Sequence, residues 1–396
     1  MSAYNPRAVE NSVEAFMKPS LSWLLVFVPV AVGLHYAAPA QHLWIFLAAC
    51  AAIVPLAGWM GRATEHLAEH TGEGVGGLLN ATFGNAAELI IALAALREGL
   101  LSVVKASLTG SILGNLLLVL GASFLGGGLK RNIQRFNATA ARMQSTMLFL
   151  AAVSLILPAS FHYLGGQGVL VAEKNLSLWF ALVLLGTYGL GLLFSLRTHV
   201  ALFSGTHGEA EELEGEVHAA WSAKKALLIL AAATALVAWM SEILVGSVEQ
   251  AAHAMGMTDL FVGVVVVAII GNAAEHSTAV LVATRNRMDL AVSIAIGSSI
   301  QIALFVAPVL VLLSYLLSPQ PMDLVFSPAE VLAVLVAVVL CSQVASDGES
   351  HWLEGAQLLA VYVLLGLLFY FLPASAGHVP PPPALSPQPT YVPVGR

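Results

Sequence analysis

The sequence predicts an all-α polytopic membrane protein with eleven transmembrane helices: one extra N-terminal helix, then two inverted five-helix repeats. Hydrophobic residues make up 58% of the 396 residues and charged residues only 10%, a balance typical of membrane proteins. Apolar stretches long enough to cross a bilayer recur along the chain. In addition, the six residues Gly84–Leu89 (GNAAEL) return 187 positions later as Gly271–His276 (GNAAEH).

The expected spans are eleven mostly apolar stretches, because a helix needs about 20 residues to cross the hydrocarbon core. They cover residues 21–38, 43–61, 75–96, 106–128, 146–164, 176–196, 226–248, 260–283, 291–317, 325–346 and 356–373. With the N-terminus in the cytoplasm, twelve of the sixteen basic residues fall on the inner side, as the positive-inside rule requires. Lys105 is among those expected outside. We therefore expect an integral membrane protein with a cytoplasmic N-terminus.

The repeat divides the chain into segments. They are a cytoplasmic N-terminus (1–20), the extra helix (21–38), the first repeat (39–200), a cytoplasmic acidic linker helix (201–222), the second repeat (223–375) and a disordered proline-rich tail (376–396). A repeat with an odd number of spans enters the membrane from opposite sides in its two copies. The two copies of the hexapeptide are therefore expected near a shared midplane.

Each copy of the hexapeptide places a glutamate, Glu88 or Glu275, inside an apolar stretch. A carboxylate at that depth is costly and is usually part of an ion or proton pathway. No lysine or arginine lies in the apolar core of a predicted span to pair with either glutamate. The alternative, a buried glutamate paired for packing, is therefore disfavoured, and we interpret the two residues as a cation and proton exchange site.

The residues around these glutamates are those of a hard-cation site. Gly84 and Gly271 allow a break in the helix that frees backbone carbonyls, and Asn85 and Asn272 add amide oxygens on the face of the glutamates if the helical turn persists. Such oxygens suit Ca²⁺. Further polar residues either complete the ligand shell or hydrogen-bond between helices, and both alternatives stay open: Ser111, Asn115, Ser298 and Gln301.

Several other residues have competing interpretations. His276 fits packing or hydrogen bonding better than direct ligation. Glu65 and Glu242 either line the ion path or stay near the boundary with water, where Arg62 explains Glu65 as a surface ion pair. Glu330 follows Ser-Pro-Ala and is interpreted as part of a capping box.

One short motif indicates a different chemistry. The segment His66-Leu67-Ala68-Glu69-His70 matches a zinc-protease pattern, but it lies at a predicted helix end, and short matches are often accidental. The two cysteines, Cys50 and Cys341, are expected to be core residues without a disulfide. The basic residues form no stripe for nucleic acid, and no cofactor is expected.

These motifs resemble the Ca²⁺/H⁺ exchanger (CAX) family of the cation/Ca²⁺ antiporter superfamily. The resemblance covers about residues 40–373. It includes the paired hexapeptides, Gly110–Leu116, Gly297–Pro308, the acidic segment and Asp347–Gly355. It implies eleven helices, Glu88 and Glu275 as exchange carboxylates, and a homotrimer in a bacterial inner membrane. It also implies a cytoplasmic acidic helix that captures Ca²⁺, for which the candidates are Glu209, Glu212 and Glu216; a solvated linker helix is the alternative.

The expected function is secondary antiport that removes Ca²⁺ from the cytoplasm in exchange for H⁺, with Ca²⁺ and protons competing for Glu88 and Glu275. A Na⁺-coupled exchanger of the same fold is the nearest rival. It would need more hydroxyl and carboxylate ligands in each repeat than the single deep glutamate present. An intramembrane metalloenzyme at His66, Glu69 and His70 and a passive channel are the remaining alternatives.

Overall fold

The computed structural model describes residues 21–71, 73–165, 170–200 and 221–373. Within these residues nearly all regular structure is helical, as predicted. The elements are η1 (Leu21–Val26), α2 (Phe27–Ala37), α3 (His42–Thr71), α4 (Glu73–Phe83), α5 (Ala86–Arg97), α6 (Leu101–Leu113), η2 (Gly114–Val119), α7 (Leu120–Gly128), β1 (Gln134–Arg135), α8 (Ala138–Gly165), α9 (Leu170–Leu193), η3 (Phe194–Thr198), α11 (Ala223–Ala254), α12 (Asp259–Phe261), η6 (Val262–Val267), α13 (Ala268–Gly271), α14 (Ala273–Thr284), α15 (Met288–Gln301), η7 (Ile302–Val306), α16 (Ala307–Leu317), α17 (Pro328–Val344), β2 (Glu349–Ser350) and α18 (Trp352–Phe371). The predicted N-terminus, most of the acidic linker and the proline-rich tail lie outside the described residues.

Seven helices in the described part of the chain are long and apolar enough to cross a membrane, or eight if the bent pair α12–α13 and α14 counts as one span. Two shorter apolar helices occupy Ser22–Ala37 and Pro328–Val344, where two further spans were predicted. The predicted span 75–96 is divided between α4 and α5. The chain is therefore an all-helical membrane protein with about seven spans that length and composition alone identify.

Several helices extend beyond the predicted apolar stretches. Helix α8 begins at Ala138 rather than at residue 146, and α6 begins at Leu101 rather than at residue 106. Lys105, expected in a connection outside the span, therefore lies within α6 and is 9% exposed. Its Nζ donates to Asp323 Oδ1 at 2.6 Å and to the Val325 carbonyl at 2.8 Å. Hydropathy marks only the lipid-facing length of a helix, whereas the hydrogen-bonded helix continues into the polar boundary.

Both hexapeptides interrupt a helix, as their glycines predict. Helix α4 ends at Phe83 and α5 begins at Ala86; α13 ends at Gly271 and α14 begins at Ala273. The bend between Asp259–Gly271 and Glu275–Thr284 is 61°. The asparagines, rather than positive-φ glycines, carry the irregular backbone, since Asn85 has φ −102° and ψ 26° and Asn272 has φ −97° and ψ 6°. Each asparagine is nevertheless the N-cap of the following helix, and the Asn85 and Asn272 carbonyls accept from the Leu89 and His276 N–H groups at 3.0 and 2.9 Å, so the turn from each asparagine to its glutamate persists.

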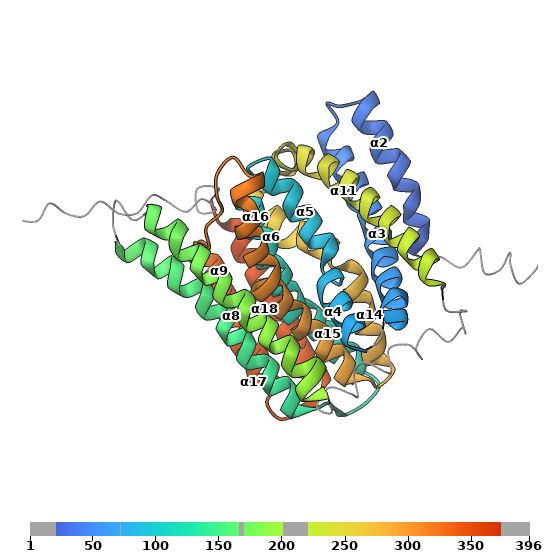
Figure 1. Ribbon diagram of the computed structural model, residues 1–396, viewed down its shortest axis with the longest axis vertical. Coiled ribbons are helices and arrows are strands. Elements are labelled where there is room, and N and C mark those ends of the chain that lie inside the picture. Colours follow the sequence, from blue (N-terminus) through green and yellow to red (C-terminus); the bar gives the residue numbers. More distant parts are fainter. Residues whose placement is uncertain (1–20, 72, 166–169, 201–220, 374–396) are drawn as a thin grey trace, which may run out of the picture.

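The broken helices lie among longer ones (Figure 1). Helices α3 and α11 cross and pack along much of their length, with α2 beside them, and α7 packs against α18. Helix α6 continues through η2 into α7, and the most apolar window of this run is 83% buried, so it forms much of the core. A two-residue antiparallel ladder pairs Gln134 with Ser350 and Arg135 with Glu349 and joins the chain before α8 to the chain before α18.

The capping box predicted at the start of α17 is confirmed. The Ser327 hydroxyl accepts from the Glu330 backbone N–H, Pro328 is the first helical residue, and Glu330 Oε2 accepts from the Ser327 N–H at 2.9 Å. A second box, formed by His351 and Glu354, begins α18.

Candidate cation site

The structure brings together the two regions that carry the predicted glutamates. Glu88 lies in the first turn of α5 and Glu275 in the first turn of α14. A Cβ placed on Gly271 would lie 3.5 Å from Glu88 Cγ and 3.7 Å from Glu88 Oε1, so Glu88 contacts the break just before the helix that carries Glu275. The two carboxylates also interact electrostatically.

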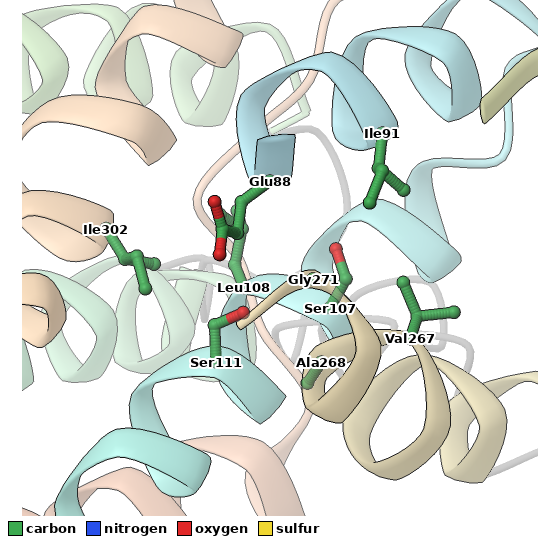
Figure 2. Close-up of a pocket in the computed structure, with 9 residues that line it drawn as sticks. All are labelled: Glu88, Ile91, Ser107, Leu108, Ser111, Val267, Ala268, Gly271 and Ile302. Atoms are coloured by element: carbon green, nitrogen blue, oxygen red, sulfur yellow. The ribbon is translucent and has the colours of Figure 1, made fainter. Parts of the chain in front are cut away.

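Figure 2 shows the Glu88 carboxylate directed into a small pocket between α5, α6, η7 and the end of α13. The Ser111 hydroxyl lies on one side of this pocket, and the backbone at Gly271 lies beside the carboxylate. The remaining lining is mostly apolar: Ile91, Ser107, Leu108, Val267, Ala268 and Ile302. A carboxylate in such surroundings needs a proton or a cation to neutralise it.

Glu275 has one strong hydrogen bond. The Ser298 hydroxyl on α15 donates to Glu275 Oε2 at 2.6 Å. The equivalent hydroxyl in the first repeat, Ser111, is not donated to Glu88 but accepts a hydrogen bond from Asn272 Nδ2 at 3.0 Å. The two glutamates therefore have different partners although their local sequences match.

The two asparagines form hydrogen bonds between the repeats. Asn85 Nδ2 donates to Gln301 Oε1, and Asn272 Nδ2 donates to Ser111 and to the Ala268 carbonyl. Of the two alternatives left open for Ser111 and Gln301, the structure shows hydrogen bonding between helices. The amide carbonyl oxygens of Asn85 and Asn272 remain without a donor.

Three buried acceptor atoms thus lack a hydrogen-bond partner at the site: Asn85 Oδ1, Asn272 Oδ1 and Glu88 Oε2. Buried oxygens are normally paired, so an unpaired set marks a place that a cation or proton completes. Among the described residues no group of three or more His, Cys, Asp or Glu side chains is placed to hold a metal. Two carboxylates together with amide and hydroxyl oxygens are the donors available there, a set that would suit a hard cation such as Ca²⁺.

His276 and Asn115 lie on the other side of this region. A Cβ on Gly114 would be 3.9 Å from both Cε1 and Nε2 of His276, so the imidazole packs against the start of η2. This contact agrees with the interpretation of His276 as a packing residue, although its Nε2 has no hydrogen-bond partner. Asn115 is 1% exposed, and its amide nitrogen also lacks a partner.

The remaining acidic candidates, Glu65 and Glu242, lie in different surroundings. Glu65 is exposed on α3, close enough for its charge to act on Glu275. Glu242 does not lie near the site: its side chain is 60% exposed, and its carboxylate accepts a hydrogen bond from Arg97 Nη1 at 3.2 Å. The sequence predicted the position of Glu242 along its helix but not the side of the helix on which it lies. The linker candidates Glu209, Glu212 and Glu216 lie outside the described residues.

The zinc-like motif has a local explanation. His66 Nδ1 lies 3.2 Å from Glu69 Oε1, while His70 Nδ1 lies 2.7 Å from the His66 carbonyl oxygen. The His66 ring also packs on Trp221, with ring centroids 4.7 Å apart. These contacts hold the three side chains at the end of α3, and among the described residues they are not part of a group of three or more side chains that could hold a metal.

Two polar contacts near the site were not predicted from the sequence. Ser107 lines the pocket one turn before Ser111, and this four-residue spacing could have identified it. Thr109 on α6 donates to Glu330 Oε1 at 3.2 Å, so the capping glutamate also fastens α17 to the helix that carries Ser111. The capping pattern gave no signal for that second role.

Removing either unpaired amide oxygen should weaken cation binding. We expect Asn85→Ala and Asn272→Ala each to reduce Ca²⁺ affinity about tenfold, roughly 1.4 kcal/mol, because each removes a ligand oxygen and a link between the repeats. Equilibrium ⁴⁵Ca²⁺ binding to purified protein measures this loss. Gln343→Ala, at an exposed side chain on α17, is the matched control. Unchanged affinity in both asparagine variants would remove these oxygens from the site.

The chain is similar in sequence to known proteins over most of its length. The model of the family described as "Sodium/calcium exchanger protein" matches residues 41–197 and 225–371. A Ca(2+)/H(+) antiporter of Synechocystis is 47% identical over 364 residues, covering 88% of this chain and 96% of that protein. The Ca(2+)/H(+) antiporter ChaA of Bacillus subtilis is 47% identical over 329 residues, covering 83% and 92%.

Solved structures show the same fold. That of native YfkE, 42% identical, superposes with a TM-score of 0.76 and covers 89% of this chain and all of that one. The H+/Ca2+ exchanger CAX superposes with a TM-score of 0.64 over 88% of this chain and 91% of that one; at 15% identity it shows the fold alone.

Proposed function

This chain belongs to the sodium/calcium exchanger protein family, and from its site we propose that it exchanges Ca²⁺ for H⁺ by competition of the two ions for Glu88 and Glu275. It is a membrane transporter of the Ca²⁺/H⁺ antiporter type and not an enzyme, like the relatives that share nearly half of its residues. Ca²⁺ and H⁺ are its substrates, and no cofactor is proposed.

The observation that carries the proposal is the meeting of two acidic helix starts from the two halves of the chain. Glu88 contacts the break before α14, interacts with Glu275, and has an unpaired carboxylate oxygen. Among the described residues neither glutamate forms an ion pair with lysine or arginine. Positive charge for this pair must therefore come from solution.

Charge accounting gives the cycle. Two protons or one Ca²⁺ neutralise the pair, whereas two bare carboxylates in an apolar region are costly. The carrier therefore reorients when loaded and stalls when empty, which couples the two ions. Protons that enter from the acidic side release Ca²⁺ there and drive it out of the cytoplasm.

The same proposal includes eleven membrane crossings. Eight of these crossings are the seven long helices and the bent pair α12–α14. The other three are the short helices η1–α2 and α17 and the broken pair α4–α5. The 187-residue offset relates α4–α5 to α12–α14 and α6–α7 to α15–α16 as inverted repeats. The positive-inside rule places the N-terminus in the cytoplasm, in a bacterial inner membrane. A homotrimer and Ca²⁺ capture by the acidic linker stay predictions.

Two rivals predict different coupling. A Na⁺-coupled exchanger is the nearer, since the family includes sodium/calcium exchangers. The single deep glutamate in each repeat and the relatives named as proton antiporters favour H⁺. A passive channel would move Ca²⁺ without either gradient.

A flux assay separates these functions. In inside-out vesicles with an acidic lumen, we expect ⁴⁵Ca²⁺ uptake that a protonophore abolishes and that replacing Na⁺ with choline leaves unchanged. The reason is that protons, and not Na⁺, neutralise the two carboxylates and displace Ca²⁺. Uptake that requires Na⁺ would establish the nearer rival, and uptake that ignores both gradients would indicate a channel. Vesicles lacking the protein are the control.

A further inference from the structure

The two halves of the protein differ at one matched helix contact. Gly110 on α6 lies so close to the Val264 carbonyl of η6 that a Cβ there would collide with backbone. A Cβ on Gly263 would likewise lie 2.6 Å from the Ala106 Cβ. At Gly297 on α15, the residue 187 positions after Gly110, an added Cβ would meet nothing within 4 Å.

Burial shows the same difference. Val262 in η6 is fully buried, whereas its counterpart in α4, Val75, is 55% exposed. The most apolar window of Leu101–Gly128 is 83% buried and that of Met288–Leu317 is 56% buried. Helix α6 packs along η6, α12 and α13, but α4 packs against α3, η3 and α5, with no comparable packing on α15 among the described helices.

In this structure, helix α4 packs against α3 and η3 instead. A Cβ on Gly76 would lie 2.6 Å from the Ala68 carbonyl oxygen at the end of α3, and a Cβ on Gly77 would lie 2.6 Å from Leu196 Cδ2 of η3. Residues 75–80 are regular α-helix there, while their counterparts 262–267 form a π-helical turn against α6. One side of the site is thus closed by a tight helix contact, and the matching contact on the other side is open.

We propose that Gly297 is the seat on which residues 75–80 of α4 pack when the cytoplasmic side of the site closes. This step rests on the proposed alternating access between inverted repeats, in which each half takes the arrangement that the other half has in the opposite state. Gly77, the counterpart of Val264, then lies against Gly297, and Val75 becomes buried as Val262 is now. Helix α4 leaves Ala68 and Leu196 to do so.

Only glycine suits this seat, because the closed contact places backbone against Cα. In the closed pair, Gly110 already shows that even a methyl group would meet a carbonyl. A side chain at position 297 therefore leaves the present state undisturbed and prevents the opposite one. This separates binding from transport.

The test uses Gly297→Leu in the full chain. We expect normal folding in detergent, cytoplasmic-side ⁴⁵Ca²⁺ binding within about twofold of wild type, and at least a tenfold loss of proton-driven uptake. Gly366→Leu on α18, where a Cβ also meets nothing within 4 Å, is the control and should transport normally. Normal uptake by Gly297→Leu would overturn the proposal.

A thiol-accessibility measurement tests the contact itself, including the case in which the leucine variant fails to fold. Val75→Cys is combined with Cys50→Ala and Cys341→Ala, which remove the two buried free thiols. Because Val75 is 55% exposed here and becomes buried in the closed contact, its cysteine should react with a maleimide more slowly during turnover than at rest. Leu129→Cys, at a 71% exposed residue after α7, should react equally in both conditions. Labelling of a transporting Val75→Cys variant that turnover leaves unchanged would also overturn the proposal.

Wild type and Glu88→Gln are measured in parallel, because they distinguish failure of the proposed Ca²⁺/H⁺ exchange from failure of the proposed contact at Gly297. Absent proton-driven uptake in wild type would contradict the proposed function. Active wild type, inactive Glu88→Gln and fully active Gly297→Leu would contradict only the closing seat.

Discussion

Glu88→Gln and Glu275→Gln should each reduce proton-driven Ca²⁺ uptake by at least a hundredfold. Glutamine preserves the shape of the side chain but cannot be ionised, so the pair can no longer exchange one divalent cation for two protons. The loss corresponds to about 2.8 kcal/mol or more, since each tenfold change is about 1.4 kcal/mol. ⁴⁵Ca²⁺ uptake by inside-out vesicles, normalised to the amount of protein, measures it.

Glu242→Gln is the matched control. Glu242 also lies in a predicted span, but its carboxylate is exposed and paired with Arg97. An exposed ion pair contributes little, so uptake should stay within about twofold of wild type. If the variants of Glu88 and Glu275 transported as well as this control, the exchange mechanism would be wrong.

Gly110→Val should have the second large effect. Its Cβ would collide with the Val264 carbonyl, and backbone cannot rotate away as a flexible side chain can. We expect at least a tenfold loss of uptake and a lower melting temperature in detergent, because overpacking typically costs about 1–3 kcal/mol. Uptake and thermal unfolding on the same preparation measure both.

Gly189→Val provides the comparison, because an added Cβ on this exposed residue of α9 meets nothing within 4 Å. It makes the same substitution in a helix without the close contact, so both uptake and melting temperature should stay near wild type. Equal behaviour of the two variants would show that the α6–η6 contact is not needed for transport.

The sequence was sufficient for the features that depend on local pattern. The repeated hexapeptide predicted two broken helices, and both α5 and α14 begin just after the breaks. The Ser-Pro-Ala-Glu pattern predicted the capping box at Ser327 and Glu330. These features follow from residue type and spacing, which the sequence contains completely.

Features that depend on tertiary packing could not be predicted from the sequence. Spacing placed Ser111 and Ser298 on helix faces but did not show that Asn272 binds one and Glu275 the other. Hydropathy placed Glu242 within a span without showing that it faces outward. The rotation of a helix about its axis and the choice among nearby partners are set by tertiary contacts, which a periodic pattern does not encode.

The π-helical segments η2 and η7 carry a consequence for the origin of the protein. They cover Gly114–Val119 and Ile302–Val306, which coincide when the second half is shifted back by 187 residues. A π turn arises when one additional residue is accommodated in a helix, and such bulges are rare. The simplest history is one insertion in a single ancestral gene, inherited by both halves when that gene was duplicated. A half-length ancestor would then have worked as an antiparallel dimer, inserting into the membrane in both directions.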